Sequence, residues 1–371
     1  MQELDGSEVS TLRWINERAV LRLLFESDSA RSVTDIASSC ALSRPTVEGA
    51  LAQLLHDEWV IESAPERSGK GAGRPAKRYA FADRSKLIVG VDLGPHGVVC
   101  AVATLRGEPL ATTRSPELDL QEGPSALDAL ISTVHRALAE AGGREQDVIA
   151  LAVGLPAIVG LDGRIALTVV VPQWREFDLP ERVRERFAGI HVMFENDAKL
   201  ATVAEYSWGS AIGTRTAVNV IVGHRVAAGM IIDGRLARGT HGGAGEIGAL
   251  PAARWGDVYR SLEGPDGSIQ GTLEAVASGD PVALQKLQTF ADDLSQGIAA
   301  ICLVLDPEVV VIGGGVAQLG ERLISTLQEA VCRITLFPVE LRASTLGQSA
   351  VARGGVALCR DHVTETVLQI A

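Results

Sequence analysis

Apolar side chains recur with two different spacings along the chain. Within residues 16–26 they stand at Ala19, Val20, Leu23 and Leu24, which is the spacing of one face of an amphipathic helix. Farther along, short apolar runs rich in valine and isoleucine alternate with helical patterns, as in a mixed α/β protein. The chain is therefore expected to begin with a small helical unit and to continue as a larger α/β part.

Two short helices are expected to follow the first one. Thr34 is a candidate N-cap for the second helix and Ser43 for the third, which carries Pro45 in its first turn. Residues 59–61 and Arg78–Phe81 are expected to be strands on either side of a loop. The buried face of the third helix is expected to comprise Val47, Leu51, Leu54 and Leu55. This order of elements is that of a winged helix-turn-helix.

A basic, glycine-rich strip lies within this unit. Residues 63–86 carry seven basic side chains against two acidic ones, in a chain of 371 residues whose net charge is −12. A solvated linker between domains would have a similar composition. Next to a helix-turn-helix pattern, however, a basic loop is typical of a wing that contacts DNA phosphates. The overall acidic charge therefore conceals a local basic element.

Double-stranded operator DNA is the expected partner of this unit. The third helix would enter the major groove with its N-terminal side chains nearest the bases, and the wing would contact phosphates and the minor groove. The candidate DNA-binding residues are Ser43, Arg44, Thr46 and Gln53 on the helix, with Lys70, Arg74, Lys77 and Arg78 in the wing; Glu48 shares the free face of the helix. A unit that serves dimerisation alone is the alternative.

The remaining composition narrows the class of protein. Hydrophobic residues make up 46% of the chain, and its length suggests two or three domains. Neither a signal-peptide pattern nor an apolar run long enough to span a bilayer occurs, which predicts a cytoplasmic protein without a membrane partner. The five cysteines lie far apart and have no metal-ligand spacing. We therefore expect free, buried thiols.

The larger part resembles the ROK family of repressors, open reading frames and sugar kinases, and specifically its transcriptional-repressor branch. The resemblance is carried by GRPA at 73–76, END at 195–197 and DGRLARGTHGGAGEIG at 233–248. It implies an α/β protein in which a winged helix-turn-helix precedes a two-lobed, actin-like ATPase fold. The expected limits are residues 1–82 for the DNA-binding domain, 86–197 with the C-terminal helix at about 350–371 for the smaller lobe, and 198–349 for the larger lobe.

The same resemblance implies a sugar pocket. Asp197 stands at the position of the general base in ROK kinases, where a carboxylate accepts the proton of the attacking sugar hydroxyl. Asn196, Glu246 and Glu274 match family positions that hydrogen-bond sugar hydroxyls. Here Asp197 is expected to be a vestige of that base and not a catalytic residue.

The family's phosphate and zinc motifs are altered. The first phosphate loop reads DLGPHG at 92–97, in which a proline lacks the N–H that a phosphate would accept from. The second reads GHRVAAG at 223–229, in which side chains replace glycines. Residues 249–271 contain neither His nor Cys, so the family's zinc cluster cannot form. No cofactor, no metal and no kinase activity are expected.

The sequence therefore predicts a repressor of carbohydrate-related genes that senses a sugar or sugar derivative and forms a homodimer or homotetramer. An active ROK sugar kinase with an appended DNA-binding module is the alternative. A DNA-binding scaffold without a ligand is a third possibility. The apolar segment 297–305 is a candidate for core packing or for an oligomer contact, and core packing is favoured.

Overall fold

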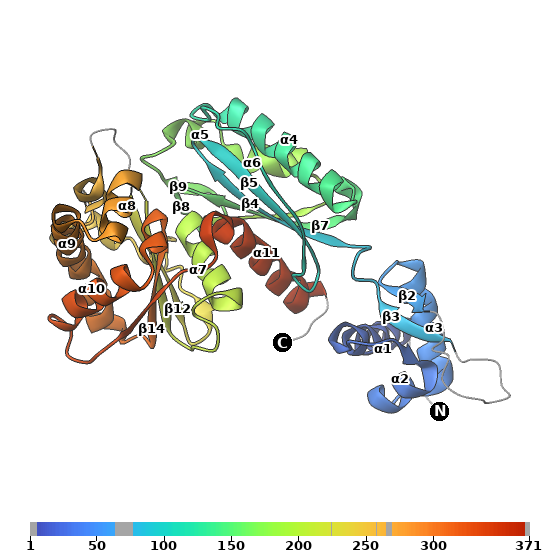
Figure 1. The fold of residues 1–371 in the computed structure, drawn as a ribbon. Coiled ribbons are helices and arrows are strands. Elements are labelled where there is room, and N and C mark those ends of the chain that lie inside the picture. Colours follow the sequence, from blue (N-terminus) through green and yellow to red (C-terminus); the bar gives the residue numbers. More distant parts are fainter. Residues whose placement is uncertain (1–5, 64–76, 224, 257, 265–268, 368–371) are drawn as a thin grey trace.

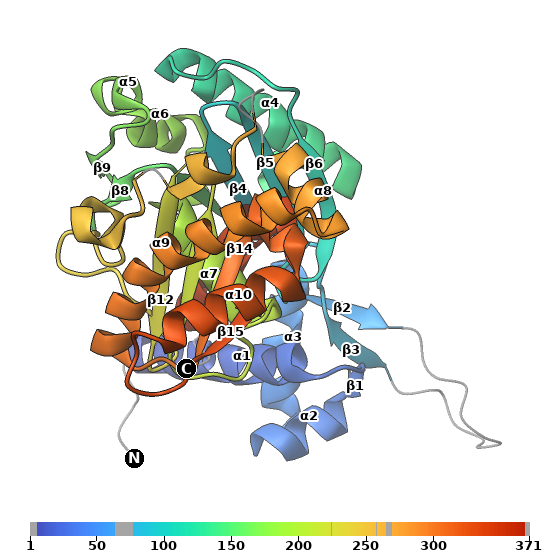
Figure 2. The ribbon, with the colours of Figure 1, turned by 60° about the vertical axis from the view of Figure 1, so that its left-hand side comes forward.

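The computed structural model describes the chain except residues 1–5, 64–76, 224, 257, 265–268 and 368–371. A small N-terminal head is followed by two α/β lobes (Figure 1). Figure 2 shows the head lying at one end of the two lobes, with its long first helix running beneath them.

The head is a three-helix unit closed by a small antiparallel sheet. Its elements are α1 (Gly6–Glu26), β1 (Arg31–Ser32), α2 (Val33–Cys40), α3 (Arg44–His56), β2 (Val60–Ser63) and β3 (Arg78–Phe81), with sheet order β1-β3-β2. The helices close on a core that includes Val20, Leu24, Ile36 and Val47. The predicted order of helices and strands is confirmed, and the loop between β2 and β3 lies outside the described residues.

The structure corrects two predictions for the head, one on a helix cap and one on a core residue. The N-cap of α2 is Ser32 and not Thr34, because the Ser32 hydroxyl accepts the N–H of Asp35 while the Asp35 carboxylate accepts the N–H of Ser32. In α3, Leu55 is only partly buried, whereas the other three predicted core residues are buried. The reciprocal pair at Ser32 satisfies two helix-end donors, which a lone threonine cap does not.

The smaller lobe contains a five-stranded sheet in the order β10-β7-β4-β5-β6. Its elements are β4 (Leu87–Gly94), β5 (Gly97–Thr104), β6 (Pro109–Arg114), α4 (Gly123–Ala141), η1 (Glu145–Asp147), β7 (Val148–Leu155), β8 (Ile158–Val159), β9 (Ile165–Leu167), α5 (Pro172–Glu176), α6 (Leu179–Arg186) and β10 (His191–Asn196), and the C-terminal α11 (Ala350–His362) with η7 (Val363–Val367) packs on the same sheet. Helix α4 covers one face and α11 the other (Figure 1), so the central strands are apolar on both faces.

The larger lobe repeats this topology. Its elements are α7 (Asp197–Trp208), β11 (Ala217–Val222), β12 (Val226–Ile232), β13 (Arg235–Leu236), η2 (Ile247–Ala249), η3 (Pro251–Ala253), η4 (Val258–Leu262), α8 (Gln270–Ser278), α9 (Pro281–Leu305), β14 (Val309–Gly314), η5 (Gly315–Leu319), α10 (Glu321–Cys332), β15 (Glu340–Ala343) and η6 (Gly347–Ser349). The sheet order is β13-β12-β11-β14-β15. In both lobes, three antiparallel strands are extended by two parallel ones.

Helices α7 and α11 lie together between the two sheets. Glycines allow their close approach, because a β-carbon at Gly354 of α11 would stand 1.8 Å from the carbonyl oxygen of Leu200 in α7. A β-carbon at Gly90 of β4 would stand 1.9 Å from the carbonyl oxygen of Ala352. The first contact joins α11 to α7 of the larger lobe, and the second fixes α11 on the sheet of the smaller lobe, which leaves little room for α11 or α7 to move without the other.

Segment 297–305 forms the end of α9. Residues 297–299 with Ile301 and Cys302 are buried in the core of the larger lobe, as favoured from the sequence, whereas Val304 is 91% exposed. The cysteines are free thiols, but the expectation that they are buried is wrong for Cys332, which is exposed, and for Cys40, which is only partly buried. In the described part of the chain, no helix is long and apolar enough to cross a membrane.

Candidate functional site

The N-terminus of α3 presents polar side chains in a fixed arrangement. The Ser43 hydroxyl accepts the N–H of Thr46 and lies 2.7 Å from the Thr46 hydroxyl, while Nη2 of Arg44 donates to the Thr34 hydroxyl on α2 (2.9 Å). Pro45 in the first turn costs no hydrogen bond there. Thr34, Ser43 and Arg44 are exposed, whereas Thr46 is partly buried.

The other predicted DNA contacts have partners within the head. Gln53 accepts from Arg13 and donates to Asp57. Lys77, which precedes β3, forms an ion pair with Glu62 of β2 (2.7 Å), and Arg78 donates to the carbonyl of Ala30. Lys70 and Arg74 lie outside the described residues. The predicted DNA-binding roles stay predictions for all eight residues.

Replacing Ser43 with alanine is expected to loosen the start of α3. Loss of an N-cap costs about 1 kcal/mol, so amide exchange in the first turns of α3 should become about fivefold faster. Ser39→Ala is the control, because Ser39 is exposed on α2 and its side chain has no hydrogen bond within the described part of the chain. This change should leave exchange in α3 unchanged. Equal rates in the two variants would contradict the capping role.

Asn196 and Asp197 lie where β10 ends and α7 begins. Oδ1 of Asn196 caps α7 by accepting the N–H of Lys199, and its Nδ2 donates to the carbonyl of Ala157 (3.2 Å) and to Oδ1 of Asp197 (3.0 Å). The same Asp197 oxygen accepts the N–H of Ala198 (2.7 Å). The END motif therefore holds one carboxylate at the N-terminus of a buried helix.

Asp92 and Asp197 lie close enough for the charge of Asp197 to act on Asp92. Burial, with a smaller contribution from nearby Glu246, raises the pKa of Asp197 to about 6. Burial and the charge of Asp197 raise the pKa of Asp92, on β4, to about 7. Asp92 was not among the residues predicted for the site, although it opens the altered first phosphate loop. Strands β4, β7 and β10 are parallel neighbours, so the end of β4 with Asp92 lies at the same edge of the sheet as Asp197, which follows β10.

Buried Lys199 and partly exposed Arg238 join the loop 233–248 to α7 and β10, respectively. The Lys199 side chain, 1% exposed, donates from Nζ to the carbonyl of Gly242, and burial lowers its pKa. Arg238 forms an ion pair of 2.6 Å with Glu195, which is buried and also accepts the N–H of Asn196. The two most specific motifs of the sequence thus form one packed unit.

Glycines make this loop possible. Gly242 and Gly245 have positive φ angles, and β-carbons there would stand 1.9 Å from the carbonyl oxygen of Val159 and 2.1 Å from that of Ala228. The run GTHGGAGE therefore encodes a backbone path that other residues would block.

Of the residues predicted to bind a sugar, Glu246 lies near Asn196 and Asp197, whereas no described contact connects Glu274 to them. Glu246 is exposed beside η2 and lies close enough to raise the pKa of Asp197. Glu274 is exposed on α8 and accepts from Gln270 of the same helix (2.9 Å); its described contacts do not connect it to Asn196 or Asp197. Lys199, Glu195 and Arg238 were missed. A single charged residue in the otherwise uncharged run 198–204 was the signal that could have identified Lys199.

A cavity of about 370 Å³ adjoins this cluster between the two sheets. Its wall includes Asp92, Arg114, Glu205 and Asn219 together with the Gly313-Gly314 turn. Pro95 and His96 form the β4–β5 turn at its edge, so a proline stands where a phosphate would need an N–H donor. The same wall carries two acidic side chains, Asp92 and Glu205, and one basic side chain, Arg114.

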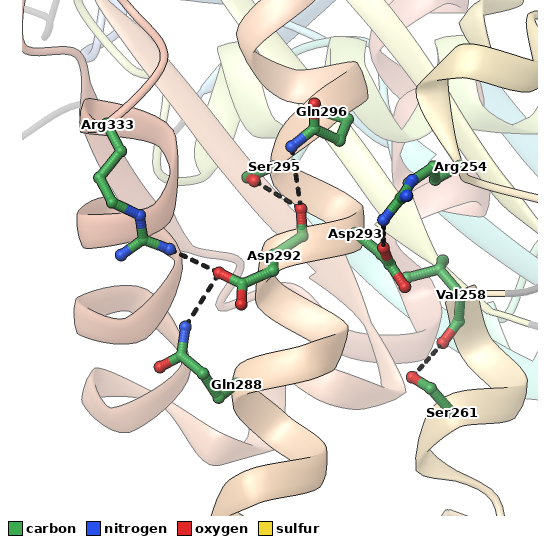
Figure 3. A network of polar contacts seen from close by, with 9 residues as sticks. All are labelled: Arg254, Val258, Ser261, Gln288, Asp292, Asp293, Ser295, Gln296 and Arg333. Atoms are coloured by element: carbon green, nitrogen blue, oxygen red, sulfur yellow. Dashed lines mark hydrogen bonds and ion pairs between the residues drawn. The ribbon is translucent and has the colours of Figure 1, made fainter.

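The segment that carries zinc in the family is held by other contacts. The indole N–H of Trp255 donates to the carbonyl of Leu294 in α9 (3.1 Å), and Arg254 pairs with Asp293 (2.6 Å). Figure 3 shows this pair beside the neighbouring contact of Arg333 with Asp292, which ties the end of α10 to α9. Within the described residues no group of three His, Cys, Asp or Glu side chains could hold a metal ion, and the donors of this segment do not fit zinc.

The two-lobed duplicated fold, with the END helix and its glycine loop at the cleft, defines a sugar-kinase-like protein. The model of the ROK family matches residues 88–269 and 258–362, and the chain belongs to that family. Its α/β fold is the actin-like ATPase fold of ROK repressors and kinases, preceded by a helical module.

Individual relatives differ in how much of the chain they share. The xylose repressor of Bacillus subtilis is 21% identical, over 98% of this chain and all of the relative. The glucokinase of Halalkalibacterium halodurans is 26% identical, over 74% of this chain and 95% of the enzyme. The crystal structure of a ROK transcriptional regulator homologous to E. coli Mlc covers 97% of this chain with a TM-score of 0.70 and 20% identity.

Proposed function

We propose that this chain is a sequence-specific DNA-binding transcription regulator, a repressor of carbohydrate-related genes, whose kinase-like domain senses a sugar or sugar derivative without phosphoryl transfer. The observation that carries the proposal is the head, an ordered three-helix unit with a small sheet. The xylose repressor and the ROK regulator align over nearly the whole chain, whereas the glucokinase aligns over about three quarters.

In this proposal α3 reads operator DNA. Arg44 and Thr46 stand at its exposed N-terminus, the part of a recognition helix that lies nearest the base edges. Residues 1–82 are the DNA-binding domain, and Lys70, Arg74, Lys77 and Arg78 supply phosphate contacts from the wing. Two heads of a homodimer or homotetramer would read two half-sites.

The ligand site of the proposal is the cluster around Asn196 and Asp197, with Glu246 and Glu274 as further hydrogen-bonding groups. A neutral sugar suits these groups, because its hydroxyls can donate to the carboxylates of Asp197, Glu246 and Glu274. This site joins residues 86–197 with about 350–371, the smaller lobe, to residues 198–349, the larger lobe. Ligand binding there would change how the lobes pack and thereby the DNA affinity.

Arg74→Ala and Arg44→Ala are expected to weaken DNA binding in different ways. Loss of the wing arginine removes a phosphate contact, so affinity should fall on all duplexes and the slope of log K against log salt should drop by about 1. Loss of Arg44 should cost about 1–3 kcal/mol on the preferred duplex and little on others. Equilibrium titrations at several salt concentrations, on duplexes selected by the full chain, measure both affinities and both slopes. If neither change alters the affinity for DNA, the DNA-binding assignment is wrong.

An active sugar kinase with an appended head is the second candidate. The raised pKa of Asp197, about 6, is compatible with a general base, and the glucokinase relative favours it. Phosphate transfer from ATP to glucose, N-acetylglucosamine and xylose distinguishes the two functions. The proposal expects no turnover above background; turnover that Asp197→Asn abolishes would establish the kinase instead.

A further inference from the structure

One arginine of the smaller lobe, Arg106, binds the head to that lobe. Arg106, in the turn between β5 and β6, donates from Nη2 to the carbonyl oxygens of Leu24 (3.3 Å) and Ser27 (3.1 Å), and its Nε lies 3.0 Å from the Asp83 carboxylate. The last carbonyls of a helix lack partners within the helix and attract a cation. Arg106 therefore caps the end of α1 and at the same time pairs with Asp83 in the turn between β3 and β4.

Aromatic rings complete this attachment. The guanidinium of Arg106 lies 5.5 Å from the ring centre of Phe25 and 5.8 Å from that of Phe81. The two rings contact each other edge to face at 5.1 Å. Because Phe25 belongs to α1 and Phe81 to β3, both ends of the head are attached to one side chain of the lobe.

The same turn touches the end of α7. Gly107 has a φ of +86°, and a β-carbon there would lie 2.8 Å from Cζ2 of Trp208, the last residue of α7. Trp208 is held in turn by α11, because the guanidinium groups of Arg353 and Arg360 lie 5.5 and 5.1 Å from its ring. The turn is thus in contact with the head on one side and with α7 on the other.

Helix α7 connects this contact with the proposed ligand site. It begins at the Asn196 cap and Asp197 and ends at Trp208, and the run from Ala198 to Glu205 is buried. One hydrophobic cluster includes the core of the head, Leu105 of the turn and Val356 of α11, and Trp208 packs against it. A buried helix of this length moves as a unit, since interior packing leaves no space to absorb a shift.

We infer that Trp208 and Arg106 are positioning residues that transmit the state of the Asn196–Asp197 site, through α7 and the β5–β6 turn, to the orientation of the head. The inference rests on the proposed function, because it assigns a physical route to the coupling between sugar and DNA. Trp208 and Arg106 belong neither to the proposed sugar site nor to the proposed DNA-binding surface.

The test measures amide exchange in the full-length chain without DNA or sugar. Asn196→Ala removes the cap of α7 and perturbs its ligand end. If α7 transmits this change, amide exchange in residues 24–31 and 104–109 should become about fivefold faster. A factor of about five is the lower end of the usual range of coupling between two sites. In a Trp208→Ala background the same cap removal should have no further effect on these segments. Asp280→Ala, which removes the N-cap of α9, is the matched control and should leave them unchanged.

Several results would overturn the inference. Unchanged exchange in residues 24–31 after Asn196→Ala would do so, as would an equal response in the Trp208→Ala background. If Trp208→Ala fails to fold, Trp208→Phe replaces it and should keep the effect of Asn196→Ala on residues 24–31. Arg106→Lys should lose that effect, because lysine lacks the fork that reaches two carbonyls. Because exchange needs no ligand, a chain that shows transmission but binds no duplex would refute the proposed function alone.

Discussion

Replacing Lys199 with methionine is expected to lower the free energy of unfolding by about 3–5 kcal/mol, the usual cost of removing one partner from a buried group of charges. The ammonium group is buried, donates to the carbonyl of Gly242 and faces the carboxylates of Glu195, Glu246 and Asp197. Methionine fills a similar volume but leaves these acidic groups with less compensating charge. The loop 233–248 would also lose the hydrogen bond that Lys199 of α7 donates to it.

Lys286→Met is the matched control for this change. Lys286 lies on α9, is only partly buried, and donates to the carbonyl of Glu263 at 3.3 Å. Its replacement should cost less than about 1 kcal/mol, as is usual for partly exposed polar groups. Denaturant unfolding of the full chain measures both variants. Similar losses in the two proteins would show that Lys199 does not hold the site together.

Asp92→Asn is expected to stabilise the protein at pH 8 and to have little effect at pH 4. The pKa of Asp92 is raised from 3.8 to about 7 in the folded state, so the folded protein binds a proton between these values that the unfolded chain has released. Stability therefore falls as the pH rises through this window, and by pH 8 the charged, buried carboxylate is unfavourable. An uncharged amide avoids this cost, which is about 2–4 kcal/mol for a shift of this size.

Denaturant unfolding at the two pH values measures the effect of Asp92→Asn. Asp128→Asn, an exposed change on α4, is the control, and its effect on stability should be the same at both pH values. An Asp92→Asn variant that is destabilised at pH 8, or that differs from the wild type equally at both pH values, would contradict the burial of a charged carboxylate beside Asp197.

The order of elements could be predicted because it depends on local pattern. Alternating apolar runs identified the strands, and the spacing of leucines identified α3 with its Ser43 cap. The cap of α2 was wrong because Ser32 and Thr34 are both suitable residue types, and the choice depends on the reciprocal bond from Asp35. Which of two neighbouring caps is used depends on the full set of hydrogen bonds and not on one residue.

The site was predictable only where its residues share a motif. Asn196 and Asp197 are adjacent in the sequence and lie together in the fold. Asp92 and Arg106 reach their partners from other strands and turns, and no periodicity encodes such contacts. Lysine is usually exposed, so a fully buried Lys199 depends on the loop that packs over it. Long-range packing, which sequence patterns do not record, decides these cases.

The most direct test of the central claim is footprinting of the full chain on DNA from its own genomic neighbourhood. Sequence-specific regulation predicts saturable protection of two related half-sites separated by one or more helical turns, with a dissociation constant of about 10⁻⁸ to 10⁻¹¹ M at physiological salt. Protection should weaken as salt increases. Uniform retention of all fragments, or no protected segment on any of them, would contradict the account.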